Sequence, residues 1–143
     1  MNDPLHKQVF VRCSPAHAFT TFTQRIDAWW PPSHRKHDDS RMELDARDGG
    51  HFIEYASDGQ TTIFGEVVEC LPPKRIVYTW NPGRGAGPTT VTVSFHPEGE
   101  GTRVEVLHVE GDSQLGEQWR ERVAIFDRAW TSVLRAFQVS TGS

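Results

Sequence analysis

Residues Trp119 to Phe137 read WRERVAIFDRAWTSVLRAF, and this stretch decides the fold. Its apolar residues recur at steps of three and four, which places them on one face of an α-helix. They are Trp119, Val123, Phe126, Trp130, Val133, Leu134 and Phe137. At 3.6 residues per turn, the stretch predicts an amphipathic helix of about five turns. Such a helix needs an apolar surface to cover, and the sequence before it predicts a sheet.

Seven segments upstream of this helix have the length and residue types of β-strands. They are Leu5–Val11, Met42–Asp45, His51–Tyr55, Thr61–Leu71, Arg75–Trp80, Thr89–His96 and Thr102–Glu110. Asp58-Gly59 is a strong signal for a hairpin turn. The Gly- and Pro-rich stretch from Asn81 to Pro88 predicts a loop between strands rather than a domain boundary.

One or two short helices are expected directly after the first strand. Ser14 is a favoured N-cap, and Pro at the next position is favoured at the start of a helix. The helix should run from Pro15 toward Gln24, and Trp29-Trp30-Pro31-Pro32 should end the helical region, because Pro disfavours helix in the residue before it. Strands flanked by helices predict an α+β fold in one domain, residues 1–143.

Composition and charge exclude several classes of protein. The net charge is −4 with no basic block, so we expect no binding to nucleic acid. No apolar run approaches the roughly 20 residues that cross a bilayer, and the polar start of the chain predicts no secretory signal. Cys13 and Cys70 make no disulfide framework, which favours a cytoplasmic location. Five Trp in 143 residues is the unusual feature that remains.

Four segments of the chain carry a resemblance to a known family. They are Val11 to Phe19 with Trp29-Trp30-Pro31, Asp48 to Glu54 with Asp58-Gly59, Gly65 to Glu69 followed by Pro72 to Trp80, and Gly101 to His108. In this order they resemble the proteins named after the activator of the heat-shock-protein-90 ATPase, within the START/birch-pollen-allergen (SRPBCC, polyketide cyclase-like) superfamily. The resemblance implies a helix-grip fold, in which a curved antiparallel sheet of six or seven strands wraps around the C-terminal helix. Members of this superfamily bind lipids, hormones and polyketides, and some catalyse cyclisation.

Aromatic side chains on both expected walls are the candidates for a ligand cavity. Alternation puts Tyr78 and Trp80 on one face of their strand, and the long helix presents Phe126 and Trp130 toward it. The resemblance places the Trp29-Trp30 pair at one end of the cavity. The full set is Trp29, Trp30, Phe52, Tyr78, Trp80, His108, Phe126 and Trp130. These residues either line a pocket for a small apolar or aromatic ligand or simply fill the core, and the sequence leaves both open.

Two polar residues are candidates for acid–base chemistry. The first is His108, which lies on an otherwise apolar face near a strand end, and the second is Glu54, provided that it points inward beside Phe52. A buried imidazole can hold or protonate a ligand, and a buried carboxylate can act as a base. The alternatives are a core histidine bonded to the backbone and a glutamate that is exposed or salt-bridged.

We expect neither a metal nor a cofactor. His34, His37, Asp38 and Asp39 have side chains that ligate metals, but their spacing in a loop fits no helix or strand geometry. The stretch from Gly83 to Gly87 lacks the strand-then-helix context of a dinucleotide-binding motif, and no nucleophile elbow occurs.

Three hypotheses for the function follow. The first is a module that binds a small hydrophobic molecule between helix and sheet. The second is an enzyme of the cyclase, dehydratase or hydrolase type that acts on an apolar substrate with His108 and Glu54. The third is a stress-related interaction domain with a chaperone partner or a second copy of itself, which requires an exposed apolar patch.

Overall fold

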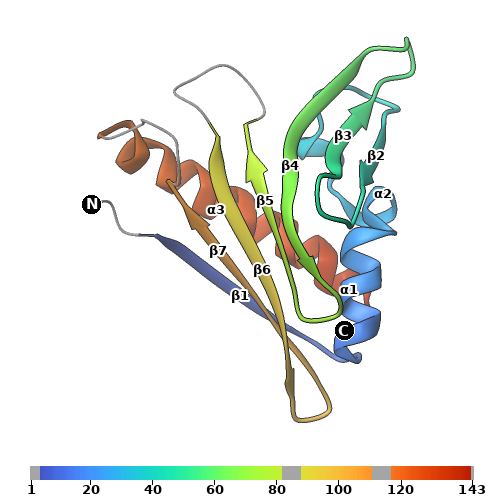
Figure 1. Cartoon of the computed structure of the whole chain (residues 1–143), viewed down its shortest axis with the longest axis vertical. Coiled ribbons are helices and arrows are strands. Elements are labelled where there is room, and N and C mark those ends of the chain that lie inside the picture. Colours follow the sequence, from blue (N-terminus) through green and yellow to red (C-terminus); the bar gives the residue numbers. More distant parts are fainter. Residues whose placement is uncertain (1–3, 82–87, 111–116, 143) are drawn as a thin grey trace.

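Seven antiparallel strands form one sheet in the order β1-β7-β6-β5-β4-β3-β2, and a long C-terminal helix crosses one face of it (Figure 1). The computed structural model describes residues 4–81, 88–110 and 117–142. The strands are β1 (Leu5–Val11), β2 (Arg41–Leu44), β3 (His51–Tyr55), β4 (Thr61–Leu71), β5 (Arg75–Trp80), β6 (Thr89–Glu98) and β7 (Gly101–Val109). The helices are α1 (Pro15–Thr23), α2 (Ile26–Trp29), the short 3-10 helix η1 (Pro32–His34) and α3 (Glu117–Ser140).

The sheet is curved, and irregularities in β4 contribute to the curvature. The pairing of β4 with β3 shifts between Phe52 and Ile53, and its pairing with β5 shifts between Val67 and Glu69. Such bulges bend a strand and increase its twist. Gly65 lies in the same region, and a Cβ there would overlap the backbone carbonyl of Thr79. The α+β helix-grip fold that the sequence predicts is confirmed.

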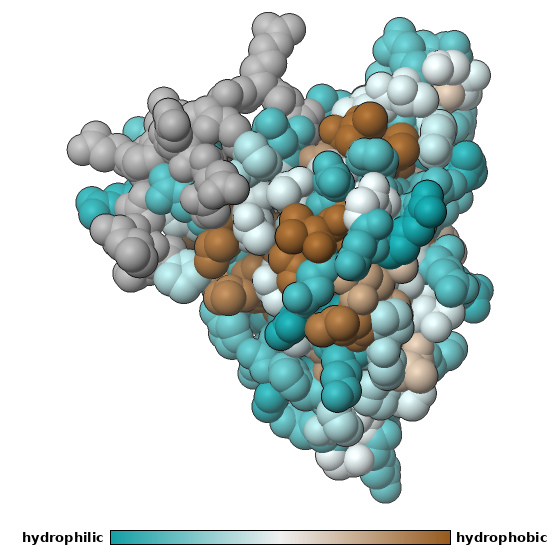
Figure 2. All heavy atoms as spheres, in the orientation of Figure 1, coloured by the Kyte–Doolittle hydropathy of each residue, from teal (hydrophilic) through white to brown (hydrophobic). Residues whose placement is uncertain are grey.

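The long helix is longer than its apolar stripe. α3 has 24 residues, and it extends beyond the predicted stretch at both ends. Five residues of the stripe are buried: Trp119, Trp130, Val133, Leu134 and Phe137. The stripe faces the sheet, whereas the opposite face of the sheet shows mainly hydrophilic residues with separate apolar groups (Figure 2).

The first helical region contains two short α-helices, in agreement with the one or two that the sequence predicts. The Ser14 hydroxyl accepts a hydrogen bond from the His17 amide at 3.1 Å, so the predicted N-cap is present. α1 ends at Thr23, and a separate turn of helix, α2, follows it. Trp30 has the extended backbone that a following Pro requires, so the Trp-Pro boundary ends α2 instead.

Most of the predicted loop from Asn81 to Pro88, including the stretch from Gly83 to Gly87, lies outside the described residues. None of the helices in the described ranges is long and apolar enough to cross a membrane.

Candidate functional site

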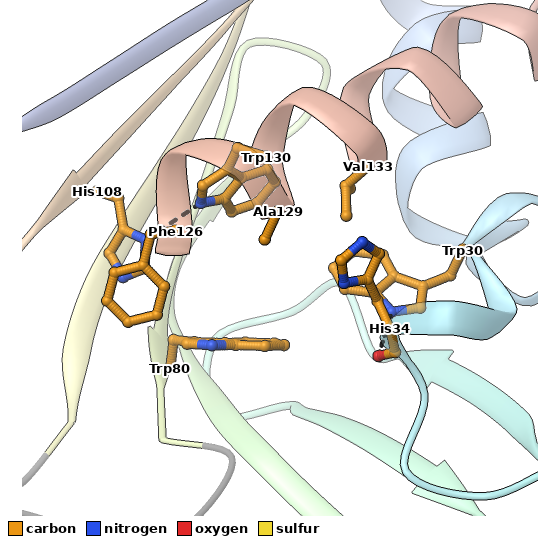
Figure 3. Close-up of a pocket in the computed structure, with 8 residues that line it drawn as sticks. All are labelled: Trp30, His34, Trp80, His108, Phe126, Ala129, Trp130 and Val133. Atoms are coloured by element: carbon orange, nitrogen blue, oxygen red, sulfur yellow. Dashed lines mark hydrogen bonds between the residues drawn. The ribbon is translucent and has the colours of Figure 1, made fainter. Parts of the chain in front are cut away.

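A cavity of about 90 Å³ lies between α3 and the sheet (Figure 3). Eight residues line it: Trp30, His34, Trp80, His108, Phe126, Ala129, Trp130 and Val133. They come from the region after α2, from η1, from the ends of β5 and β7, and from the middle of α3. The wall is therefore assembled from five parts of the chain, and six of its eight side chains are aromatic rings.

Hydrogen bonds and stacking fix three indoles in the wall of the cavity. The Trp130 indole donates to His108 Nδ1 at 3.1 Å, and the Trp30 indole donates to the His34 carbonyl oxygen at 3.2 Å. The Trp80 ring stacks on Phe64, with centroids 5.1 Å apart and planes 12° apart. A ring that moved inward to fill the space would lose one of these interactions, so they help to keep the cavity open.

His108 is buried, and both of its ring nitrogens are hydrogen-bonded. An indole N–H can only donate, so Nδ1 accepts from Trp130, and Nε2 carries the proton that is donated to Thr89 Oγ1 at 2.7 Å. The Thr89 hydroxyl in turn donates to the Trp80 carbonyl oxygen at 3.0 Å. Burial lowers the pKa of His108 from 6.5 to about 4, so the imidazole is neutral at pH 7.

Further aromatic rings close over His108 from the side of α3. Its ring centroid lies 4.5 Å from that of Phe126 and 5.6 Å from that of Trp119. Trp119 is buried, although it does not line the cavity. His108 therefore helps to position Trp130 in the wall, and neither nitrogen is free to accept a proton from a ligand.

Glu54 points inward, but it holds a loop rather than a ligand. It is fully buried, and its two carboxylate oxygens accept hydrogen bonds from the amides of Lys36 and His37, both at 2.8 Å. Burial alone would raise the pKa of Glu54, but these hydrogen bonds outweigh it and the pKa lies below its ordinary value. Glu54 does not line the cavity, so the structure does not bring the predicted acid–base pair together there.

Three predicted cavity residues lie elsewhere in the core. Trp29 donates its indole proton to the Thr21 carbonyl oxygen at 2.9 Å and packs against Phe22 and Phe137. Phe52 and Tyr78 are fully buried, with ring centroids 5.5 Å apart. Residues that share a face of a strand can thus lie at different depths, and only the outermost one on β5, Trp80, reaches the cavity.

His34 lines the cavity, although its sequence context suggests only a candidate metal ligand. It lies in η1, is half-buried and faces the cavity near Trp30 (Figure 3). Among the described residues, no group of three or more potential ligands that could hold a metal comes together. The one sequence signal for its position is the spacing of four residues after Trp30, across the turn that Pro31 and Pro32 impose.

Comparisons with known proteins address the family and the fold. The family model described as activator of Hsp90 ATPase homolog 1-like protein matches residues 12–140. A search of curated proteins found no match.

Several solved structures are similar to this chain. A protein from Rhodobacter sphaeroides is 17% identical, with a TM-score of 0.72 over 97% of this chain and 91% of that one. The Aha1 dimer from Colwellia psychrerythraea is 13% identical, with a TM-score of 0.67 over 96% and 94%. Txn09, an anthrahydroquino-γ-pyrone synthase solved in a complex, is 32% identical, with a TM-score of 0.56 over 76% and 77%. Together with the fold and the family model, these likenesses lead to one identification: the chain belongs to the family of activator-of-Hsp90-ATPase-homologue-1-like proteins.

Proposed function

We propose that this protein binds a small aromatic or apolar molecule in the cavity between α3 and the sheet. The observation that carries the proposal is an aromatic wall whose indoles are fixed around a space instead of filling it. Aromatic and apolar linings with a few placed polar groups are typical of small-molecule sites.

The size of the cavity restricts the ligand. Pockets for drug-sized ligands measure roughly 300–1,000 Å³. At about 90 Å³, this cavity suits a single ring or the end of a larger molecule. We therefore expect a ligand whose first ring inserts between Trp80 and Trp130.

Filling the cavity tests the proposal. Ala129 lines the cavity, so Ala129→Leu should occupy it and abolish binding of a one-ring probe such as 4-methylphenol, measured by calorimetry. Ala124 is exposed on the same helix, so Ala124→Leu is the matched control and should bind as the wild type does. Equal binding by wild type and Ala129→Leu would place the probe elsewhere and refute the proposal.

A second candidate function is an enzyme that acts on an aromatic substrate, and its support is the relation to Txn09 at 32% identity. His108 and Glu54 do not serve this candidate, because both are already occupied by hydrogen bonds from within the protein. Turnover of a hydroxylated aromatic polyketide that survives His108→Asn but is lost in Ala129→Leu would support catalysis in the cavity without that pair.

The third hypothesis, a chaperone partner or a homodimer, has less support. The Colwellia Aha1 protein is a dimer, but a likeness at 13% identity shows the fold alone. Light scattering on the purified protein measures whether this chain also dimerises.

A further inference from the structure

We propose that His34 selects the ligand of this cavity, and that the ligand it selects is an aromatic ring that carries a hydroxyl group. This inference rests on the proposed function and specifies its ligand class. It follows from the polar atoms of the cavity wall that have no partner within the protein.

Most polar side-chain atoms of the wall are already used. The indole N–H groups of Trp30 and Trp130 are donated within the protein, and both nitrogens of His108 are bonded. Trp80 has only an N–H to offer, which can donate but not accept. Phe126, Ala129 and Val133 have no polar side-chain atom.

His34 therefore supplies the free acceptor of the wall. Its imidazole forms no hydrogen bond with any other residue in the described part of the chain, and a neutral imidazole has one nitrogen that accepts and one that donates. A ligand that satisfies this acceptor must present a donor. A phenolic O–H is a suitable donor, and its ring suits the aromatic walls.

The backbone that carries His34 is fixed in place. Its amide donates to the Pro31 carbonyl oxygen at 3.0 Å, and its carbonyl oxygen accepts from the Trp30 indole. Arg35 adds hydrogen bonds to the Trp30 carbonyl oxygen at 2.8 Å and to Asp27 Oδ1 at 2.9 Å. Because this turn is held before any ligand arrives, little ordering of the backbone is needed on binding.

The arrangement of the wall gives the direction of the ligand. His34 and Trp30 lie on one side of the cavity, whereas His108 and Phe126 lie on the other, with Trp130 above and Trp80 below (Figure 3). A ring held between Trp80 and Trp130 would direct its hydroxyl group toward His34. The hydrophobic side of the ligand would then face Phe126.

Three matched probes separate ring binding from hydroxyl recognition. 4-Methylphenol donates and accepts a hydrogen bond, 4-methylanisole only accepts, and toluene does neither. Binding is followed by the indole N–H signals of the five Trp residues in ¹H–¹⁵N spectra, since Trp30, Trp80 and Trp130 line the cavity. We expect wild type to bind 4-methylphenol about five-fold more tightly than the other two, the effect of one net hydrogen bond.

Variants at position 34 complete the experiment. His34→Phe keeps a ring but removes the acceptor, so it should bind 4-methylphenol and 4-methylanisole equally. His34→Gln keeps an acceptor and should retain part of the preference. His17 is exposed on α1, so His17→Phe is the control and should keep the full preference.

Two results would overturn the inference in distinguishable ways. If wild type binds the probes and His34→Phe still prefers 4-methylphenol, then His34 does not recognise the hydroxyl group, and ligand binding itself stands. If none of the probes shifts the indole signals of Trp30, Trp80 and Trp130 in wild type, then the proposed function fails and the inference fails with it.

Discussion

The interface between α3 and the rest of the protein has two ends that are built from the same kinds of side chain but packed differently. We call one the closed end; it consists of Phe19, Phe22, Trp29, Phe95 and Phe137. There, the rings contact one another directly, with centroids 5.1–5.9 Å apart. We call the other the cavity end; it consists of the eight residues that surround the cavity.

The difference between the two ends lies in how their polar atoms are partnered. At the closed end, the single indole, that of Trp29, donates to a backbone carbonyl oxygen within the α1 region, and phenyl rings are free to close around it. At the cavity end, two indoles are bound to groups at the edge of the space, the His108 imidazole and the His34 carbonyl oxygen. Aromatic content alone therefore does not decide whether such an interface is solid or hollow.

Loss of a ring should cost far more at the closed end than at the cavity end. Phe22 is fully buried and contacts three other rings, so Phe22→Ala should lower the free energy of unfolding by about 3–5 kcal/mol. Phe126 is half-buried and borders empty space, so Phe126→Ala should cost about half of this or less. Urea unfolding of both variants measures the difference, and equal costs would contradict the distinction between the ends.

The cavity end should be the more sensitive to acid. Burial lowers the pKa of His108 to about 4, whereas the unfolded chain has the ordinary value of 6.5. Between these values the unfolded state binds more protons, so the contribution of His108 is complete above pH 6.5 and falls as the pH drops toward 4. The full loss is about 3 kcal/mol.

Unfolding curves measured between pH 7 and pH 4.5 test whether protonation of His108 lowers the stability of the protein. His108→Asn should flatten the dependence of stability on pH over this range. His17→Asn, at an exposed position, should leave it unchanged. A slope that is the same in wild type and His108→Asn would show that protonation of His108 does not weaken the cavity end.

Glu54 lies outside the cavity end, so its substitution should affect stability and leave ligand binding unchanged. In Glu54→Gln, one oxygen can still accept from an amide, but the new NH₂ group faces the other amide as a second donor. We expect a loss of about 1–3 kcal/mol in the free energy of unfolding. At a temperature where the variant is folded, its affinity for 4-methylphenol should be within two-fold of wild type. A large loss of affinity without loss of stability would instead place Glu54 in the binding site.

The smallest effect is expected at Tyr78, which is buried in the core beside Phe52 and Trp80. Its hydroxyl group is buried and has no hydrogen-bond partner among the described residues. Burial also raises the pKa of Tyr78, so the group stays protonated. Tyr78→Phe should therefore be neutral or stabilising by up to about 1 kcal/mol, measured by urea unfolding, with Tyr55→Phe at a half-buried position as control. A clear loss of stability in Tyr78→Phe alone would reveal a partner for this hydroxyl group.

The sequence predicted the elements of this fold well because regular elements repeat their pattern. The three- and four-residue spacing of α3 and the alternation in β5 to β7 predict which side chains face inward. His34 has no such pattern around it, since it lies in a 3-10 turn between two non-repeating segments. Its place in the cavity wall depends on the path of the chain after Trp30, which hydrogen bonds from Arg35 hold.

The predicted site residues show a second limit of prediction from sequence: alternation gives the face of a side chain but not its partners. Alternation puts His108 on the inner face, and the structure agrees. However, its partners are Thr89 on a neighbouring strand and Trp130 on α3, and no local pattern could indicate that both of its nitrogens would be occupied. Phe52 and Tyr78 also face inward as predicted, but they pack against each other and against Trp80 without lining the cavity, which alternation alone does not reveal.

The sequence by itself determined the family, the α+β helix-grip fold and the aromatic character of the helix–sheet interface, because periodicity and residue type are local properties of the chain. Only the tertiary structure decided where that interface is solid and where it is hollow. The indole hydrogen bonds of Trp29, Trp30 and Trp130 hold these three rings in place, one at the closed end and two at the cavity end. The partner of Trp130 is His108 on β7, a separate element of the chain, and these two residues meet only when the sheet has closed around α3.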